Sequence, residues 1–188
     1  MASLPLTSLP VTSPPARRHV LQTANLRLVP ITMADADRLA VLHADHRVMQ
    51  FLKHGVLSRQ QSDAMVADYE AEWSGLGFGS WTAAELTTGR LVGYGGLRVH
   101  DRGLGIALRA AFVPEAQGKG YGPELGRASI DFAFDVAGAA RVSAVTRESN
   151  SAGRRSLEKL GMMLEKQEKS PEGVLLCIYV ALRTNRGG

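Results

Sequence analysis

The segment of the sequence best suited to bind a ligand follows an expected strand and opens an expected helix. The first N–H groups of a helix have no partner within the helix, and the helix dipole is positive at that end. Glycines allow a ligand to approach the backbone closely, and a lysine adds a positive charge. The segment therefore predicts a cradle for an anion, with phosphate as the expected guest. Its residues are Gln117, Gly118, Lys119, Gly120, Tyr121 and Gly122.

Two common phosphate-binding motifs do not describe this segment. A P-loop has Ser or Thr after its Gly-Lys pair, whereas Gly120 follows Lys119. A dinucleotide-binding fingerprint has a third glycine at the position that Pro123 occupies. From these residues alone, the alternative is a glycine-rich turn that holds no ligand.

Hydrophobic periodicity and turn residues predict the elements that position this segment. The expected order is one strand, two helices, three strands, one helix, one strand, one helix and two strands. Their approximate ranges are 26–29, 32–46, 59–73, 78–86, 91–99, 104–113, 117–136, 141–146, 150–160, 162–168 and 174–182. This order predicts one α/β domain over 23–183 with a mixed, mostly antiparallel sheet. A flexible arm is expected over 1–22 and a short basic tail over 184–188.

The composition is that of a globular protein. The chain has 188 residues, of which 45% are hydrophobic and 21% charged, and this excludes wholesale disorder and a collagen-like repeat. The longest apolar run, 174–182, is shorter than the ~20 residues of a membrane span. The single cysteine, Cys177, excludes an internal disulfide and is expected to be a small buried hydrophobe. Since residues 1–18 lack a signal-peptide pattern, a cytoplasmic protein is expected.

The net charge of +4 comes from the ends of the chain. Of the 22 Lys and Arg residues, four lie there, at Arg17, Arg18, Arg183 and Arg186. The span 25–182 is neutral, with 18 basic and 18 acidic residues. Nucleic acid is therefore not an expected partner, although the basic ends leave a nucleic-acid-associated protein as an alternative.

Two motifs, in order along the chain, resemble the GNAT superfamily of acyl-CoA N-acyltransferases. Gln117-x-x-Gly120-x-Gly122 matches the family signature Q/R-x-x-G-x-G/A. Downstream, Asn150 opens an expected helix that ends in Glu-Lys-Leu-Gly-Met162, which is similar to the second family motif. Three further stretches look like the branch of Rim-type ribosomal-protein N-terminal acetyltransferases: 26–30, 48–52 and 91–97. The resemblance covers about residues 22–182.

This resemblance implies a GNAT-like twisted sheet of about seven strands with about four helices, in which two central parallel strands splay apart. Here these strands are 104–113 and 141–146. Acetyl-CoA, the implied cosubstrate, would lie in the gap between them, with its pyrophosphate on the glycine-rich segment. Its pantetheine arm would run along Phe112 and Val113, and Asn150 would hydrogen-bond that arm.

The resemblance also implies the reaction, which is the direct attack of a neutral primary amine on the thioester in a ternary complex. The Val113 backbone N–H would stabilise the oxyanion, which is the usual family solution. Relatives carry a Tyr or a Ser as general acid where this chain has Leu157 and Gly153. Ser156 lies one helical turn beyond Gly153 and either replaces that acid or is a surface residue of the helix.

The usual general base has no counterpart in this sequence. Relatives often hold a carboxylate about ten residues before the Gln117 position, where Ile106 and Ala107 stand. Glu85 and His100 are the two candidates to replace it. Without a strong base, the acceptor amine must itself have a low pKa. At pH 7 about 10% of an amine of pKa 8 is neutral, whereas about 0.04% of an amine of pKa 10.4 is neutral. The expected acceptor is therefore a protein N-terminal α-amine or a small-molecule amine.

The acceptor pocket of the family lies between the first two helices and the sheet. Phe51, Trp73, Trp81 and Tyr94 are candidates to line it, and core packing explains each of them equally well. The histidines near the end of the first helix are typical of a solvated surface, so no metal is expected. The vacant catalytic positions leave a non-catalytic acyl-CoA-binding or regulatory module as an alternative to an enzyme. Either a monomer or a homodimer is expected.

Overall fold

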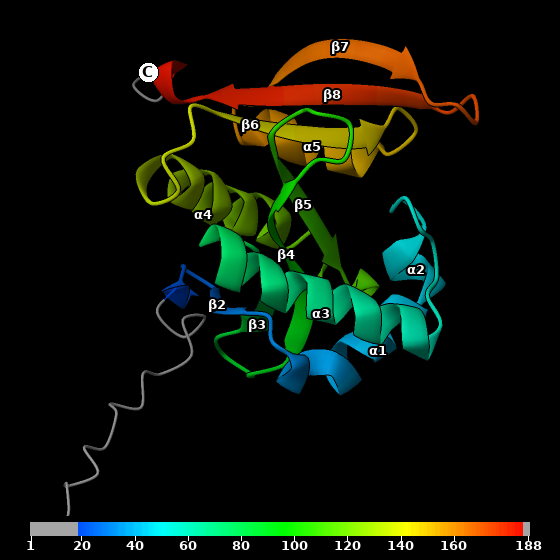
Figure 1. Cartoon of the computed structure of the whole chain (residues 1–188), viewed down its shortest axis with the longest axis vertical. Coiled ribbons are helices and arrows are strands. Elements are labelled where there is room, and N and C mark those ends of the chain that lie inside the picture. The colour runs from blue at the N-terminus through cyan, green and yellow to red at the C-terminus, as the bar shows by residue number, and fades with distance from the viewer. Residues whose placement is uncertain (1–18, 186–188) are drawn as a thin grey trace, which may run out of the picture.

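The structure is a computed structural model that describes residues 19–185; residues 1–18 and 186–188, with most of the expected arm and tail, lie outside the described part. Its centre is an eight-stranded sheet in the order β1-β2-β3-β4-β5-β6-β8-β7 (Figure 1). The strands are β1 (Leu21–Gln22), β2 (Leu26–Pro30), β3 (Ser80–Glu85), β4 (Leu91–Val99), β5 (Ile106–Phe112), β6 (Arg141–Arg147), β7 (Met163–Lys169) and β8 (Leu175–Leu182). Neighbouring strands are antiparallel except β5 and β6, which are parallel. The predicted mixed, mostly antiparallel sheet is confirmed.

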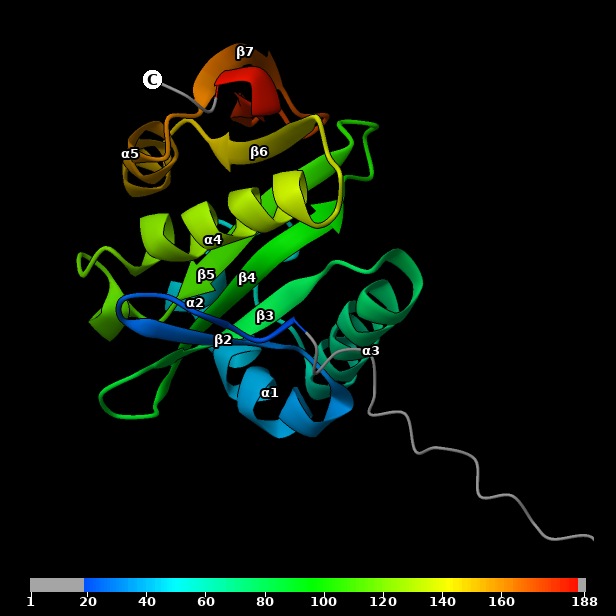
Figure 2. The same ribbon diagram turned by 90° about the vertical axis from the view of Figure 1, so that its left-hand side faces the viewer.

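Helices cover both faces of this sheet (Figure 2). One face carries α1 (Ala36–Ala44), α2 (His46–Met49) and α3 (Arg59–Leu76), and the other carries α4 (Tyr121–Asp135) and α5 (Ser151–Lys159). Each face has its own buried cluster of side chains. Leu125 and Phe132 of α4 pack in the larger cluster, and Leu39 of α1 and Tyr69 of α3 pack in the smaller one. The sheet is therefore the middle layer of three.

The parallel strands β5 and β6 separate soon after they begin. They pair at one position, Ala107 opposite Ser143, whereas β4 and β5 pair at seven positions. Ala110, three residues further along β5, is exposed although β5 lies inside the sheet. The sheet is therefore open between the C-terminal halves of β5 and β6, which is the splayed arrangement that the resemblance implies.

The helix expected over 32–46 is divided into shorter pieces. A 3-10 turn at Met33–Asp35 precedes α1, and the Thr32 N–H donates to the Asp35 carboxylate at 3.1 Å. Asp45 then interrupts the helix with an extended backbone, and its carboxylate accepts from the Arg47 N–H at 2.8 Å. This interaction caps α2, so the chain forms a second short helix beyond the end of α1.

Other boundaries differ from the sequence-based expectations by a few residues. Helix α3 continues to Leu76 and ends at Gly77, whose φ of +72° is favoured by glycine. Leu21–Gln22, within the segment expected to be a flexible arm, instead form a strand that pairs with β2. Cys177 is buried and free, as expected. Among the helices of residues 19–185, none has the length and apolarity that a membrane crossing requires.

Candidate functional site

The glycine-rich loop follows the C-terminal end of strand β5 and leads into α4. Gly118 and Gly120 have φ values of +77° and +85°, which glycine adopts without strain. A Cβ built on either residue meets no atom within 4 Å, so the loop faces open space. Tyr121 and Gly122 begin α4, and their N–H groups therefore have no acceptor within the helix. The N–H of Gln117 already donates to a carbonyl three residues earlier, so the cradle is shorter than expected and extends from 118 to 122.

Glu85, at the end of β3, holds this loop from one side. Its carboxylate accepts from the Tyr121 hydroxyl at 2.6 Å and from the Thr88 hydroxyl at 2.7 Å, and it lies 3.2 Å from Lys119 Nζ. These hydrogen bonds lower the pKa of Glu85 to about 2. A carboxylate with so low a pKa is a poor proton acceptor at neutral pH, so these contacts favour a structural role for Glu85 over the expected role of general base. Glu85 instead positions the loop.

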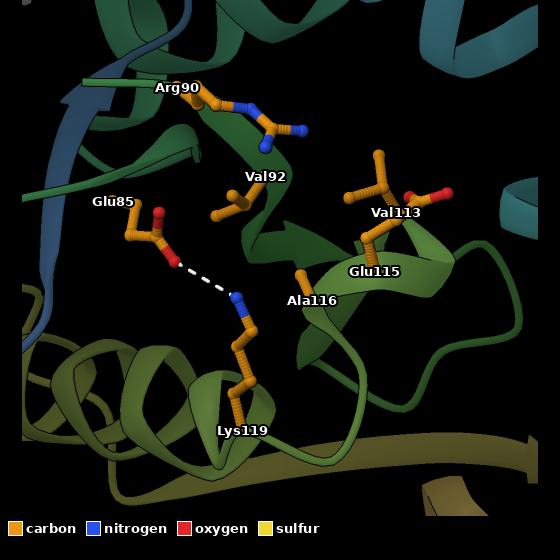
Figure 3. Close-up of a pocket in the computed structure, with 7 residues that line it drawn as sticks. All are labelled: Glu85, Arg90, Val92, Val113, Glu115, Ala116 and Lys119. Carbon is orange, nitrogen blue, oxygen red and sulfur yellow. Dashed lines mark hydrogen bonds and ion pairs between the residues drawn. The ribbon is translucent and has the colours of Figure 1, made fainter. Parts of the chain in front are cut away.

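Figure 3 shows Lys119 reaching from the loop toward Glu85 across a small pocket. The other residues that line this pocket are Arg90, Val92, Val113, Glu115 and Ala116. Arg90 and Lys119 are exposed cations, and they lie close to two carboxylates. The pocket is therefore small and is lined by both charged and apolar side chains.

Asn150 approaches the gap between β5 and β6 from the side of β6. Its Oδ1 accepts from the Gly153 N–H at 3.0 Å and caps α5, while its Nδ2 donates to the Thr146 hydroxyl at 3.1 Å. A Cβ at Gly153 would lie 2.5 Å from Asn150 Nδ2. Glycine at 153, where relatives carry Ser, therefore allows Asn150 to keep this orientation.

Ser156 lies beside the glycine-rich loop. Its Oγ is 3.7 Å from a Cβ built on Gly122, and it donates to the Ala152 carbonyl at 3.0 Å. Close packing of α4 on α5 brings these residues together, because a Cβ at Gly126 would lie 2.5 Å from the Leu160 side chain. The structure therefore brings Ser156 to the same site as the loop.

The Val113 N–H, expected to stabilise an oxyanion, is already used in the sheet. It donates to the Val92 carbonyl at 2.9 Å. In an antiparallel ladder, alternate residues direct their backbone groups to the same neighbouring strand. Since Val113 faces β4, Ala110 and Phe112 direct their N–H groups toward β6, beyond the last paired position at Ala107. The backbone amides that face the gap are those of Ala110 and Phe112.

His100 and the glycine-rich loop lie at opposite ends of strand β5. It precedes β5, whereas the loop follows β5, and a seven-residue strand spans about 20 Å. Its Nδ1 accepts from the Arg102 N–H at 3.1 Å and lies 3.4 Å from the Asp101 carboxylate. The side chain belongs to the turn between β4 and β5, so the structure does not bring His100 together with the glycine-rich loop.

The four aromatic residues expected to line an acceptor pocket do not lie together. Trp73 and Trp81 have ring centres 4.8 Å apart and are buried in the larger cluster with Phe132. Tyr94 is buried in the smaller cluster, and Phe51 is 42% exposed. Core packing, the alternative left open for these residues, explains both tryptophans, and the structure does not bring all four aromatic side chains together.

A group of polar side chains beneath α3 was not predicted from the sequence. This polar cluster contains His43, Tyr69, Glu72, Arg98 and Arg109, which come from α1, α3, β4 and β5. Glu72 Oε1 accepts from Arg98 Nε at 2.7 Å, and the Arg98 guanidinium lies 5.0 Å from the centre of the Tyr69 ring. Within residues 19–185, four buried atoms of the cluster lack a hydrogen-bond partner: His43 Nε2, Tyr69 Oη, Glu72 Oε2 and Arg109 Nη2.

Glu72 approaches the part of β5 where a carboxylate was expected and not found. Arg98, which holds Glu72, is the direct cross-strand partner of Ala107. Burial raises the pKa of Glu72 above its ordinary value. Burial, together with the charge of Arg109, lowers the pKa of His43 to about 4, so His43 is neutral at pH 7. The spacing of Tyr69 and Glu72 puts them on one face of α3, and this is the sequence signal that would have identified Glu72.

Comparison with protein families decides what this arrangement is. Residues 25–163 match a family model described as an acetyltransferase (GNAT) domain. The chain belongs to the GNAT family. The predicted enzyme class, an acetyl-CoA-dependent acetyltransferase, is confirmed.

Solved GNAT structures share this fold over most of the chain. A putative GNAT-family acetyltransferase from Bordetella pertussis is 23% identical, has a TM-score of 0.76 and aligns over 87% of this chain and 99% of its own. A putative ribosomal-protein-serine acetyltransferase from Vibrio cholerae is 19% identical, with a TM-score of 0.70 over 89% and 99%. The aminoglycoside acetyltransferase AAC(6')-Ib in complex with coenzyme A is 18% identical, with a TM-score of 0.68 over 85% and 94%. At these identities the likeness establishes the fold.

The residues of this GNAT domain fit a coenzyme A-like ligand. The loop from 118 to 122 offers free backbone amides to phosphate, and the open amides of Ala110 and Phe112 offer a strand edge to an amide-containing arm. Asn150 and Ser156 line the opposite side. Within the described part of the chain, no group of three or more His, Cys, Asp or Glu side chains is arranged to hold a metal ion.

Proposed function

We propose that this GNAT domain transfers the acetyl group of acetyl-CoA to a primary amine by direct attack within a ternary complex. The observation that carries the proposal is the open gap between β5 and β6, which is continuous with the glycine-rich loop. The gap gives the thioester a place in the middle of the sheet, accessible to an acceptor from the face that carries α1–α3. The acceptor is a protein N-terminal α-amine or a small-molecule amine, and the similarity to a ribosomal-protein-serine acetyltransferase supports the former.

In this proposal the backbone holds the donor. The amides of the loop from 118 to 122 receive the pyrophosphate, and the Lys119 ammonium adds a positive charge. Asn150 donates to the pantetheine arm, which lies along Phe112 in place of a paired strand. The N–H of Ala110 or of Phe112 takes the role expected of Val113 and donates to the oxyanion that develops at the thioester carbonyl.

Glu72 is the proton acceptor in this proposal. Its Oε2 has no hydrogen-bond partner within residues 19–185, and burial raises its pKa, so it is a better base than Glu85. It accepts the amine proton as the C–N bond forms, and the C–S bond then breaks to release the thiolate. Ser156, beside the loop, is placed to donate a proton to the departing sulfur.

The same chemistry favours amines of low pKa. A carboxylate base does not deprotonate a free lysine side chain efficiently, because lysine has a pKa of about 10.4, against about 8 for an α-amine. At pH 7 the neutral fractions of the two amines differ by more than about 200-fold. The proposed enzyme therefore acetylates α-amines in preference to lysines.

Acetyl-CoA consumption with paired acceptors tests this proposal. Thiol release from acetyl-CoA is measured at pH 7 with a peptide that has a free N-terminus and no lysine, and with an N-terminally blocked peptide that contains lysine. The expected result is release with the first peptide at a rate at least 100-fold above the second. A preference for the lysine peptide would contradict the proposed acceptor. A thermal shift by acetyl-CoA without thiol release from any amine would instead indicate a non-catalytic acyl-CoA-binding module.

A further inference from the structure

Arg109 is a half-buried cation in the middle of β5 that forms no ion pair with any described residue. Within residues 19–185 no ion pair or side-chain hydrogen bond involves its guanidinium, and Nη2 is buried without an acceptor. The acid of the polar cluster, Glu72, is near enough for the charge of Arg109 to oppose the rise in pKa that burial causes, but its carboxylate is already paired with Arg98 at 2.7 Å. Removing a charge from water without a partner costs several kcal/mol, so a position like this one is normally neutralised.

The residues that flank Arg109 within the sheet are small. On its own strand, Ala107 and Ala111 share its face, and its direct cross-strand partner is Gly96, which has no side chain. The positive charge of Arg109 contributes to the lowered pKa of both His43 and His54. The one nearby carboxylate of the polar cluster, Glu72, is already paired with Arg98, and small residues flank Arg109 along β5 and on β4.

Arg109 lies on the acceptor side of the gap and not on the phosphate-binding side. Arg109 and Ala111 share the face that packs against α1–α3, since Ala111 belongs to the smaller buried cluster. The glycine-rich loop leads into α4 on the other face. The next residue along β5 is Ala110, whose backbone faces the open gap. The guanidinium is therefore positioned beside the point where an acceptor amine must approach the thioester.

Two buried atoms of opposite charge in the polar cluster have no partner, namely Arg109 Nη2 and Glu72 Oε2. A single molecule that carries both an ammonium and a carboxylate would supply both missing partners. Arginine suits the second group, because its planar guanidinium matches carboxylate geometry. Glu72 is 15% exposed and Arg98 is 24% exposed at the side chain, so the cluster is accessible from solvent.

We propose that Arg109 binds an acidic group of the acceptor, so that the preferred substrate is an amine that carries a carboxylate. This proposal rests on the proposed amine acetylation and adds a substrate class to it. No covalent step is added: the carboxylate of the acceptor pairs with Arg109 while its amine lies at Glu72.

Matched acceptor pairs that differ in one carboxylate provide the test. The pairs are aspartyl- and asparaginyl-alaninamide, glutamyl- and glutaminyl-alaninamide, and alanylglycine and alanylglycinamide. For at least one pair, kcat/KM is expected to be at least about tenfold higher for the acidic member, which corresponds to about 1.4 kcal/mol. The difference is expected mainly in KM, because the carboxylate is an anchoring group.

Variants at Arg109 link the preference to this side chain. In R109Q the ratio of kcat/KM within the preferred pair is expected to fall to about one, and R109K is expected to keep part of it because the charge remains. R109Q is also expected to melt no lower than the wild type, since it removes an unpaired buried charge. Arg27, an exposed strand arginine on β2, is the matched control, and R27Q is expected to keep the full preference.

Calorimetric titration of the acidic peptides into the CoA-saturated wild type supplies a readout that does not depend on turnover. Binding that R109Q abolishes supports the proposal. Three results would overturn the proposal. They are equal kcat/KM within all three pairs, a preference that survives in folded R109Q, and calorimetric titrations in which no acidic peptide binds the wild type. If neutral and acidic amines are acetylated equally, the proposed function stands and only the acidic substrate class fails. If acetyl-CoA neither binds nor transfers to any amine, both fail.

Discussion

In the proposed function, the two sides of β5 recognise ligands by different means. On the side of α4, recognition depends on backbone amides and glycines that are consecutive in the chain, from 118 to 122. On the side of α3, it depends on the side chains of five residues from α1, α3, β4 and β5 that are separated by up to 66 positions in the sequence, between His43 and Arg109. One site is local in sequence and the other exists only after folding.

This difference separates what the family shares from what one member selects. A backbone cradle binds any coenzyme A-like phosphate in the same way, whatever amine is acetylated. A cluster of side chains from several elements can change one residue at a time while the sheet remains intact. We therefore expect substitutions in the polar cluster to alter acceptor turnover, and substitutions in the loop to alter affinity for acetyl-CoA.

Substitution of Glu72 is expected to have the largest effect on acceptor turnover. E72Q keeps the shape of the side chain and removes the proton acceptor, so kcat at pH 7 is expected to fall about 100-fold, within the range of general-base catalysis. Because burial raises the pKa of Glu72, the wild-type rate should decline as the pH falls through that raised pKa. E72Q should lose this decline, which is measured as the pH profile of thiol release.

Glu70, two positions away on the same helix, provides the control. Its Oε1 accepts a hydrogen bond from the Met33 N–H at 3.4 Å, whereas the ion pair of α3 with Arg98 is that of Glu72. E70Q is expected to change kcat less than twofold. S156A is expected to lower kcat only a few-fold, because a thiolate leaves readily without a full proton transfer. An E72Q enzyme with wild-type kcat and pH profile would show that the amine needs no carboxylate from the polar cluster.

Substitution of Gly120 tests whether the glycine-rich loop controls the affinity for CoA. In G120V a β-branched side chain occupies a φ of +85° at the start of α4, which strains the loop and obstructs the approach of the pyrophosphate. The dissociation constant for CoA is expected to rise at least about tenfold, or about 1.4 kcal/mol. Calorimetric titration of CoA into the folded variant measures it.

Gly138 allows strain to be separated from lost binding. It has a φ of +68° and open space around its Cβ, but it lies beyond the far end of α4. G138V should therefore lower the melting temperature by a similar amount and leave CoA affinity unchanged. Equal loss of CoA affinity in both variants would mean that general destabilisation, and not contact with phosphate, explains G120V.

The same contrast explains how much could be predicted from the sequence. The order of strands and helices and the splay of β5 from β6 followed from hydrophobic periodicity and from the two family motifs. The loop followed from consecutive glycines and a helix start, which are local features. Glu72 and Arg109 were missed because their meaning depends on cross-strand register, which places Arg98 opposite Ala107.

The expectations that the structure does not favour have a related origin. Glu85 carries the right chemistry for a base, but hydrogen bonds from residues 36 and 34 positions away lower its pKa. Trp73 and Trp81 were candidate pocket residues because aromatic side chains serve both pockets and cores, and only packing distinguishes the two. The Val113 N–H was expected to face the oxyanion, but successive residues of β5 direct their N–H groups to opposite neighbouring strands, and that of Val113 donates to β4.

The smallest expected effect is on the stability that the hydrogen bonds of Glu85 to the glycine-rich loop contribute to the ligand-free protein. Glu85 has a folded-state pKa of about 2, below the ordinary 4.5, so the folded state binds its proton less readily than the unfolded state. Its contribution to stability is therefore fully present above about pH 4.5 and is lost as the pH falls toward 2. E85Q removes this contribution at every pH.

The melting temperatures of the wild type and E85Q should therefore differ most above pH 5 and converge as the pH approaches 2.5. Glu115 lines the same pocket and is exposed, and E115Q should follow the wild type throughout. A constant gap between the wild type and E85Q across this range would mean that Glu85 keeps an ordinary pKa. In that case the hydrogen bonds from Tyr121 and Lys119 would contribute little, and the loop would depend on ligand binding for its order.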